Sequence, residues 1–131
     1  MKLARYAAVD DYGVLVNPMI AAGQAHGAIA QGVGQALFEH AVYDPASGQL
    51  IAGSFMDYAM PRADDLPSFD LGFNGTRCTT NPLGVKGCGE AGAIAAFPAI
   101  ANAILDALAP FDVTNLTGPA TPSRIRKAIG R

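Results

Sequence analysis

One glycine-rich segment holds the residues whose types and spacing could do chemistry. Residues 81–92 read Asn-Pro-Leu-Gly-Val-Lys-Gly-Cys-Gly-Glu-Ala-Gly, and the apolar run after them predicts a helix from Ala93 to Leu108. A glycine-rich loop that opens a helix suits an anion, because its backbone N–H groups are free and the helix dipole is positive there. The segment lacks the GxxxxGK[ST] order, so we do not expect a nucleotide phosphate loop.

The charged side chains of this segment are Lys86 and Glu90, and small residues flank both. Small neighbours let a substrate or cofactor approach closely. A glutamate at a helix start feels two opposed influences, because the dipole stabilises its charged form while burial in an apolar cleft raises the pKa of a carboxylic acid. Two interpretations of Glu90 therefore stay open at this point: a residue that only favours the helix dipole, and a general base.

A second helix is predicted from about Met19 to Ala41, and it must help to position this segment. Its apolar stripe predicts a face turned to the core, and the glutamines of the opposite face fall within about 20° of one direction. The core stripe is Ile29, Val33 and Leu37, and the amide stripe is Gln24, Gln31 and Gln35. The amide stripe is either a solvated face or a contact surface, and the many glycines of this helix favour close packing.

The remaining elements are short. We expect strands at Tyr6–Asp10 and Phe69–Phe73, a hairpin around the Asp44–Gly48 turn and a surface loop at Pro61–Ser68. Pro98 should break or kink its helix, and the last helix should be capped by Thr121 with Pro122 in its first position. Together these elements predict an α+β fold, a small sheet with packed helices, in one domain over residues 1–131.

Composition narrows the function classes. The net charge is −2 and no basic stripe exists, so nucleic acid is not an expected partner. The apolar stretch Ala91 to Leu105 spans fifteen residues, fewer than the ~20 of a membrane span. The N-terminus does not have the pattern of a signal peptide, so we expect a cytoplasmic chain. His26, His40, Cys78 and Cys88 lack the spacing of metal ligands, so we expect no metal site built from them. Only 15% of residues are charged, which indicates either ordinary scatter or a surface covered by other protein.

Four motifs resemble those of one known protein family and occur in the same order along the chain. The stretch Gly84-Val-Lys-Gly-Cys-Gly-Glu-Ala-Gly92, with the Ala-Ile-Ala-Ala-Phe-Pro run after it, closely resembles the C-terminal end of the molybdopterin-binding large subunit of the xanthine dehydrogenase and aldehyde oxidase family. Ala8-Val-Asp-Asp-Tyr-Gly13, the Gly23 to Leu37 segment and Pro119-Ala-Thr-Pro122 are similar to the same family. The resemblance spans nearly the whole chain, and it is nearest to the bacterial carbon monoxide dehydrogenase-type branch.

The resemblance implies specific roles. Glu90 matches the general base of the hydroxylation, Gln24 matches a glutamine that hydrogen-bonds the pterin cofactor, and Gly89 matches a backbone position near the metal centre. Lys86 belongs to the motif in a supporting role, setting loop geometry or electrostatics. The implied cofactor is molybdenum with molybdopterin in its cytosine dinucleotide form, carried by the full enzyme and not by this chain alone.

The family's large subunit is several times longer than this chain, so the resemblance implies a C-terminal fragment of a molybdenum-cofactor-binding domain. Expected partners are the remainder of the large subunit, a flavin subunit and a 2Fe–2S subunit, and without them the chain would be inactive and open to self-association. Two alternatives stay open: an interaction or scaffold module that keeps the family fold without chemistry, and a small ligand-binding protein that uses the Gly84 to Gly92 loop for anions, with Lys86 contributing to the binding.

Overall fold

A computed structural model describes residues 1–130 of the chain. Its elements follow the order β1 (Tyr6–Asp10), α1 (Pro18–Leu37), η1 (Ala63–Asp65), β2 (Phe69–Phe73), α2 (Ala91–Leu108), η2 (Ala109–Phe111) and α3 (Pro122–Ala128). The two strands pair in parallel, with Tyr6 opposite Phe69 and Asp10 opposite Phe73. The α+β prediction is confirmed, and both strands begin and end where the sequence predicted.

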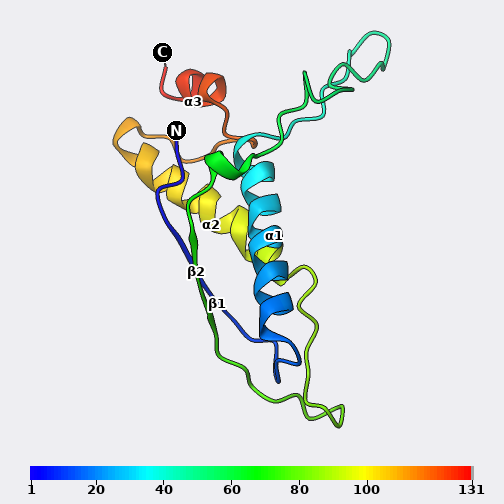
Figure 1. The fold of residues 1–131 in the computed structure, drawn as a ribbon. Helices are drawn as coiled ribbons and strands as arrows, with labels where there is room; N and C mark the ends of the chain where they lie inside the picture. The colour runs from blue at the N-terminus through cyan, green and yellow to red at the C-terminus, as the bar shows by residue number, and fades with distance from the viewer. Residues whose placement is uncertain (131) are drawn as a thin grey trace.

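The two long helices form the core of the chain. They cross in the middle of the molecule, and the strand pair runs alongside them (Figure 1). Ile29 and Val33 are fully buried and Leu37 nearly so, which confirms the predicted apolar stripe of α1. Glycine makes the crossing close: a Cβ built on Gly32 would lie 2.5 Å from the Cβ of Ala96.

The ends and the continuity of the helices depart from the prediction. α1 ends at Leu37 rather than Ala41, because the N–H groups of Phe38 and Glu39 both bond to the carbonyl of Gly34. The break predicted at Pro98 is wrong, and α2 runs through it unbroken. Pro98 and Ile94 are both exposed, so the hydrogen bond that proline cannot make lies on the solvent side, where water can replace it.

α2 is also longer than the sequence argument assumed. Together with η2, the stretch Ala91–Phe111 is long and apolar enough, by length and composition alone, to cross a membrane. The count of fifteen residues therefore underestimated it. Part of its apolar surface has a use within the chain, because Ala96, Ile100 and Ile104 join the core that α1 also fills.

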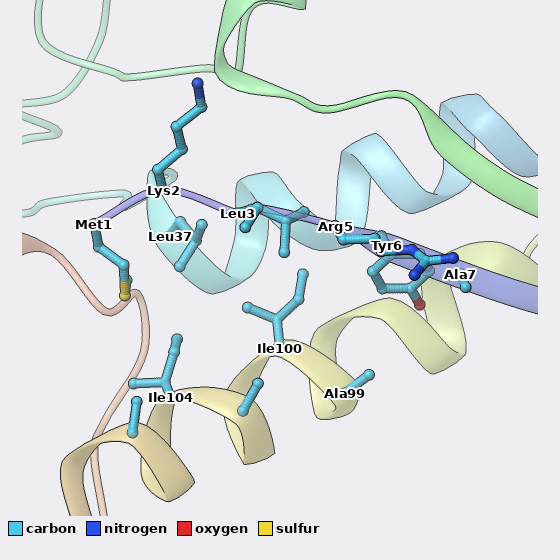
Figure 2. Close-up of a pocket in the computed structure, with 13 residues that line it drawn as sticks. Met1, Lys2, Leu3, Arg5, Tyr6, Ala7, Leu37, Ala99, Ile100 and Ile104 are labelled. Carbon is cyan, nitrogen blue, oxygen red and sulfur yellow. The ribbon is translucent and has the colours of Figure 1, made fainter.

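An arm extends beyond this core, and a groove opens beside it near the N-terminus. Residues 41–60 form an arm that projects from the end of α1 (Figure 1), with the predicted hairpin reduced to a single bridge between Tyr43 and Leu50. At the N-terminus, an apolar groove of about 560 Å³ lies between the residues that lead into β1 and the side of α2 (Figure 2). Its walls include Leu3, Tyr6 and Ile100.

The predicted loop Pro61–Ser68 contains one short helical turn, η1. The last predicted helix is confirmed as α3, and the Thr121 hydroxyl caps it by accepting from the N–H of Arg124. Neither element contributes to the site described below.

Candidate functional site

The glycine-rich segment and the amide stripe meet in the structure. The side-chain amide of Gln24 donates a 2.7 Å hydrogen bond to the carbonyl of Gly89, although 65 positions separate the two residues in the chain. Gln31 and Gln35 are exposed on the same side of α1 as Gln24. This contact places Gly89, the residue before Glu90, directly beside Gln24, the first residue of the amide stripe.

Glu90 stands at the first turn of α2. Its carbonyl accepts from the N–H of Ile94 at 3.1 Å, while its carboxylate does not cap the helix. Among residues 1–130, no side chain forms a hydrogen bond or ion pair with that carboxylate, and the residue is exposed. The burial considered from sequence is therefore not observed in this chain, and the carboxylate is free to meet another molecule.

Open space surrounds the backbone near Gln24 and Glu90. A Cβ built on Gly23 or Gly27 of α1 would meet no atom within 4 Å, and the same holds for Gly87 and Gly89 of the loop. Another group can therefore approach the backbone closely on both sides of the Gln24–Gly89 contact.

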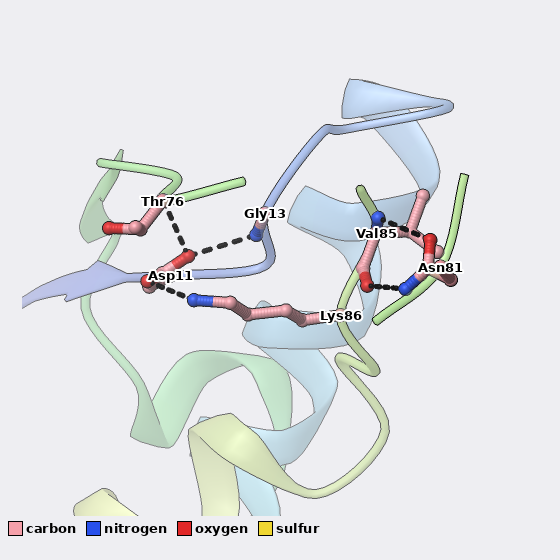
Figure 3. Close-up of polar contacts among 6 residues, drawn as sticks. All are labelled: Asp11, Gly13, Thr76, Asn81, Val85 and Lys86. Carbon is pink, nitrogen blue, oxygen red and sulfur yellow. Dashed lines mark hydrogen bonds and ion pairs between the residues drawn. The ribbon is translucent and has the colours of Figure 1, made fainter. Parts of the chain in front are cut away.

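Asn81 stabilises the loop that leads to Glu90 through side-chain hydrogen bonds. Its side-chain oxygen accepts from the N–H groups of Gly84 and Val85. Its side-chain nitrogen donates to the carbonyl of Val85 at 3.0 Å, and Figure 3 shows both bonds between Asn81 and Val85. Gly84 has a positive φ of 71°, which glycine adopts without strain. These bonds close residues 81–85 into a tight turn.

Lys86, the residue after this turn, is held by the chain segment that follows β1. Its ammonium lies 2.5 Å from the Oδ2 atom of Asp11, and its N–H donates to the carbonyl of Tyr12 at 2.9 Å. The other oxygen of Asp11 accepts from the N–H groups of Gly13 and Thr76, each at 2.9 Å (Figure 3). The bond from Lys86, followed by those two N–H bonds, holds the pKa of the Asp11 carboxyl well below its usual value.

The sequence-predicted residues thus fall into one region. Gln24 and Gly89 touch, Glu90 follows Gly89, and Lys86 lies four positions before Glu90 with its charge already paired. That pairing weakens the case for Lys86 as a free anion-binding group. Sequence reasoning gave no role to Asp11, which it named only within the Ala8 to Gly13 motif, although an aspartate two residues before a glycine is a signal for a side chain that accepts backbone N–H bonds.

Residues 87–92 also fit the GxGxxG order of dinucleotide-binding turns. That motif requires a β-strand immediately before the first glycine. Here β2 ends at Phe73, and residues 74–86 lie between it and Gly87 without a strand. The GxGxxG order is therefore present without the strand that a dinucleotide-binding turn requires, and this argues against a nucleotide loop.

A family model for the molybdopterin cofactor-binding domain matches residues 1–67, which include β1, all of α1 and Gln24. The chain belongs to the molybdopterin cofactor-binding domain family. Glu90 lies outside the matched range, but the relatives described next align across nearly the whole of this cofactor-binding domain chain.

The large subunit of nicotine 6-hydroxylase from Paenarthrobacter nicotinovorans is 41% identical over 128 residues, which are 98% of this chain and 16% of the relative. Quinoline 2-oxidoreductase from Pseudomonas putida 86 superposes with a TM-score of 0.91 at 42% identity, over 95% of this chain and 16% of that one. Carbon monoxide dehydrogenase from Oligotropha carboxidovorans superposes with a TM-score of 0.93 at 32% identity, over 98% of this chain.

The cofactor-binding domain chain therefore spans about one sixth of the length of the relatives that it matches. These relatives are oxidoreductases, named for nicotine, quinoline and carbon monoxide, and xanthine dehydrogenase subunits match as well. The family of molybdenum hydroxylases predicted from the four motifs is confirmed. The narrower carbon monoxide dehydrogenase-type branch is not distinguished from the others by these matches.

Proposed function

We propose that this chain supplies part of the active site of a molybdenum hydroxylase, with Glu90 as the general base and with Gln24 and Gly89 facing the cofactor. The observation that carries the proposal is the hydrogen bond from Gln24 to Gly89, because it joins a cofactor-facing glutamine to the residue beside the base. Neither Gln24 nor Glu90 alone would distinguish a site from a solvated surface.

The residues present suit a molybdopterin cofactor. A pterin carries many hydrogen-bonding groups, and the amides of Gln24, Gln31 and Gln35 offer both donors and acceptors on one side of α1. The open space at Gly27 and Gly89 leaves room for a flat group to lie against the backbone. In residues 1–130 no three His, Cys, Asp or Glu side chains gather, so we propose that molybdenum is held through the cofactor, in its cytosine dinucleotide form.

When bound, the cofactor supplies the oxidising metal centre and the oxygen that the substrate receives. The part of this chain is proton transfer. Glu90 accepts the proton at an oxygen of its exposed carboxylate, which no other side chain of residues 1–130 occupies. Gly89 and Ala91 flank it with small side chains, so a substrate carbon can approach the same position. The first turn of α2 fixes the backbone of Glu90 and therefore the direction from which it acts.

The rest of the site comes from other polypeptide. We propose that the partners are the remainder of a large subunit of the carbon monoxide dehydrogenase type, a flavin subunit and a 2Fe–2S subunit, with this chain as the C-terminal part of the cofactor-binding domain. Large apolar side chains at the surface support a covered face, since Val9 is 73% exposed on β1 and Ile94 is 73% exposed on α2. Alone, the chain has a base but no metal centre to act with, and we expect no turnover.

A second candidate is a scaffold module that keeps the fold without chemistry. The arm of residues 41–60 favours it, because Phe55 and Met56 are 82% and 93% exposed and the arm projects away from the two long helices (Figure 1). An interaction module needs such a surface but has no need for the free carboxylate or for the Gln24 contact.

One substitution separates the two candidates. In the enzyme assembled with its remaining polypeptides, Glu90→Gln should lower kcat by about a hundredfold or more, the size of effect typical of a general base, while the molybdenum and pterin content stays unchanged. Glu39→Gln is the matched control, because the side chain of the chain's other glutamate is hydrogen-bonded to the Tyr58 hydroxyl, and the amide oxygen of glutamine can still accept from that hydroxyl. Near-normal turnover by Glu90→Gln would exclude Glu90 as the base and leave the scaffold module.

A further inference from the structure

Asp11 links three chain segments that are distant in sequence. One oxygen accepts from Gly13, in the turn after β1, and from Thr76, in the loop after β2. The other oxygen pairs with Lys86, in the loop that leads to Glu90. Because β1 and β2 are parallel, their carboxyl ends lie at the same end of the sheet, and this brings the first two segments together.

The backbones at this point are in close contact. A Cβ built on Gly13 would lie 2.4 Å from the carbonyl oxygen of Gly84, and one on Gly75 would lie 2.0 Å from the carbonyl oxygen of Gly13. Val14 also donates to the carbonyl of Gly84 at 3.0 Å. The segments are therefore packed too tightly for side chains between them, and Asp11 adds a charged link to this backbone contact.

We propose that Asp11 is a positioning residue for Glu90, and that it acts through its ion pair with Lys86. The inference rests on the proposed function of Glu90. The stretch from Lys86 to Gly89 is anchored at both ends, at the first by Asp11 and the carbonyl of Tyr12, and at the second by Gln24. Between the anchors lies Gly87, whose backbone meets open space.

The ion pair matters for local order more than for global stability. Its two side chains are 34% and 36% exposed, and ion pairs at such positions contribute little to the stability of the whole fold. Losing the first anchor leaves a glycine-containing stretch fixed at one end only, and a displacement of about 1 Å at a catalytic group is enough to slow turnover strongly. A positioning role therefore predicts loosening that is confined to residues 86–90.

Asp11→Asn tests this in the chain by itself. An asparagine oxygen can still accept from Gly13 and Thr76, so the substitution removes the charge and keeps the turn. Hydrogen exchange followed by mass spectrometry should show peptides that cover residues 86–90 exchanging faster, by about tenfold at the Lys86 amide that donates to Tyr12, with α1 and α2 unchanged. Lys86→Met should do the same, the two substitutions together should add little, and Lys86→Arg should restore most of the protection.

Asp70→Asn is the matched control. Asp70 forms the exposed ion pair with Arg5, at 2.9 Å, on the strand pair away from the loop. That variant should leave exchange in residues 86–90 as in the unmodified chain. Unchanged exchange in both Asp11→Asn and Lys86→Met overturns the proposal, and the use of two variants protects the test against one that fails to fold.

The assembled enzyme gives the second readout. Asp11→Asn should lower kcat by about tenfold with little change in KM, because a misplaced base slows the reaction more than it weakens substrate binding. Full turnover in this variant, alongside an inactive Glu90→Gln, overturns the positioning role. Full turnover in Glu90→Gln instead rejects the proposed function, and the exchange experiment still decides whether Asp11 orders the segment.

Discussion

The side-chain amide of Gln24 and the carbonyl of Gly89 lie 2.7 Å apart, so a residue of α1 directly supports the loop that carries Glu90. The contact has two consequences for the loop. It fixes the residue before Glu90 without using the Glu90 side chain, and it occupies one amide proton of Gln24 while leaving the side-chain oxygen free to accept from another molecule.

Removing this contact should loosen the loop in the chain alone. We expect Gln24→Ala to speed amide exchange at Ile94, whose N–H bonds to the carbonyl of Glu90, and to lower the free energy of unfolding by about 0.5–1.5 kcal/mol, the usual net contribution of a hydrogen bond. Gln31→Ala is the control, because Gln31 lies on the same exposed face of α1 and its side chain makes no hydrogen bond in the described chain. Equal exchange in the two variants would show that the bond does not hold the loop.

The crossing of the two long helices gives a prediction about stability. A Cβ at Gly32 would lie 2.5 Å from Ala96, so Gly32→Ala should lower the free energy of unfolding by about 1–3 kcal/mol through overpacking. Gly27→Ala, in the same helix but facing open space, should instead raise it by up to about 1 kcal/mol, because alanine favours a helix interior. Urea denaturation of both variants measures the difference. A loss of stability at Gly27 as large as that at Gly32 would count against the close crossing.

The low pKa of the Asp11 carboxyl predicts acid sensitivity. A group whose pKa is depressed on folding stabilises the folded chain above its unfolded pKa, near 3.8, and that stabilisation is lost as the pH falls further. At pH values below about 4, the urea concentration at the unfolding midpoint should therefore decrease as the pH falls. In Asp11→Asn it should decrease less steeply. Some slope should remain in that variant, because hydrogen bonds from Ser47 and Ala46 also depress the pKa of the Asp44 carboxyl. An identical slope with and without the Asp11 carboxylate would contradict this prediction.

The exposed arm predicts self-association of the chain alone. Phe55 and Met56 point into solvent, and such large apolar surfaces favour contact with other protein. Size-exclusion chromatography with light scattering should show a mass that rises with concentration, and Phe55→Ser with Met56→Ser should shift it towards the monomer. Ile94→Ser, at a position on α2 that is 73% exposed, is the comparison that shows whether self-association depends on the arm or on α2.

Local patterns predicted most of the elements. The strands at Tyr6–Asp10 and Phe69–Phe73 were found from their flanking turns, and the buried face of α1 from the spacing of Ile29 and Val33, because side-chain periodicity is imposed by the backbone itself. The Thr121 cap was equally visible, since a hydroxyl followed by proline has few other uses.

What the sequence did not provide depends on distant parts of the chain. The parallel direction of β1 and β2 follows from the path of residues 11–68 between them, and no local signal encodes it. The link from Asp11 to Thr76 and Lys86 is of the same kind. Pro98 failed as a breaker because the exposure of its helix face, decided by packing against α1, made the missing hydrogen bond harmless.

Within the site, motif resemblance identified Gln24, Gly89, Glu90 and Lys86, and the structure brings them into one region. Their contacts could not be derived from spacing, since Gln24 and Gly89 are 65 positions apart. The roles of Glu90 and of the glutamine stripe stay predictions until the substitutions above are measured.

The parallel pairing of the strands also sorts the molecule by end. The N-terminal residues and α3 lie at one end, and the Asp11 cluster lies at the opposite end, where β1 and β2 finish (Figure 1). A tether to an electrode or a resin, placed before β1, would therefore leave the cluster facing the solution. A chain immobilised in this way could be tested for binding of other polypeptide at the end that carries the cluster, because the attachment point and that end do not compete for the same space.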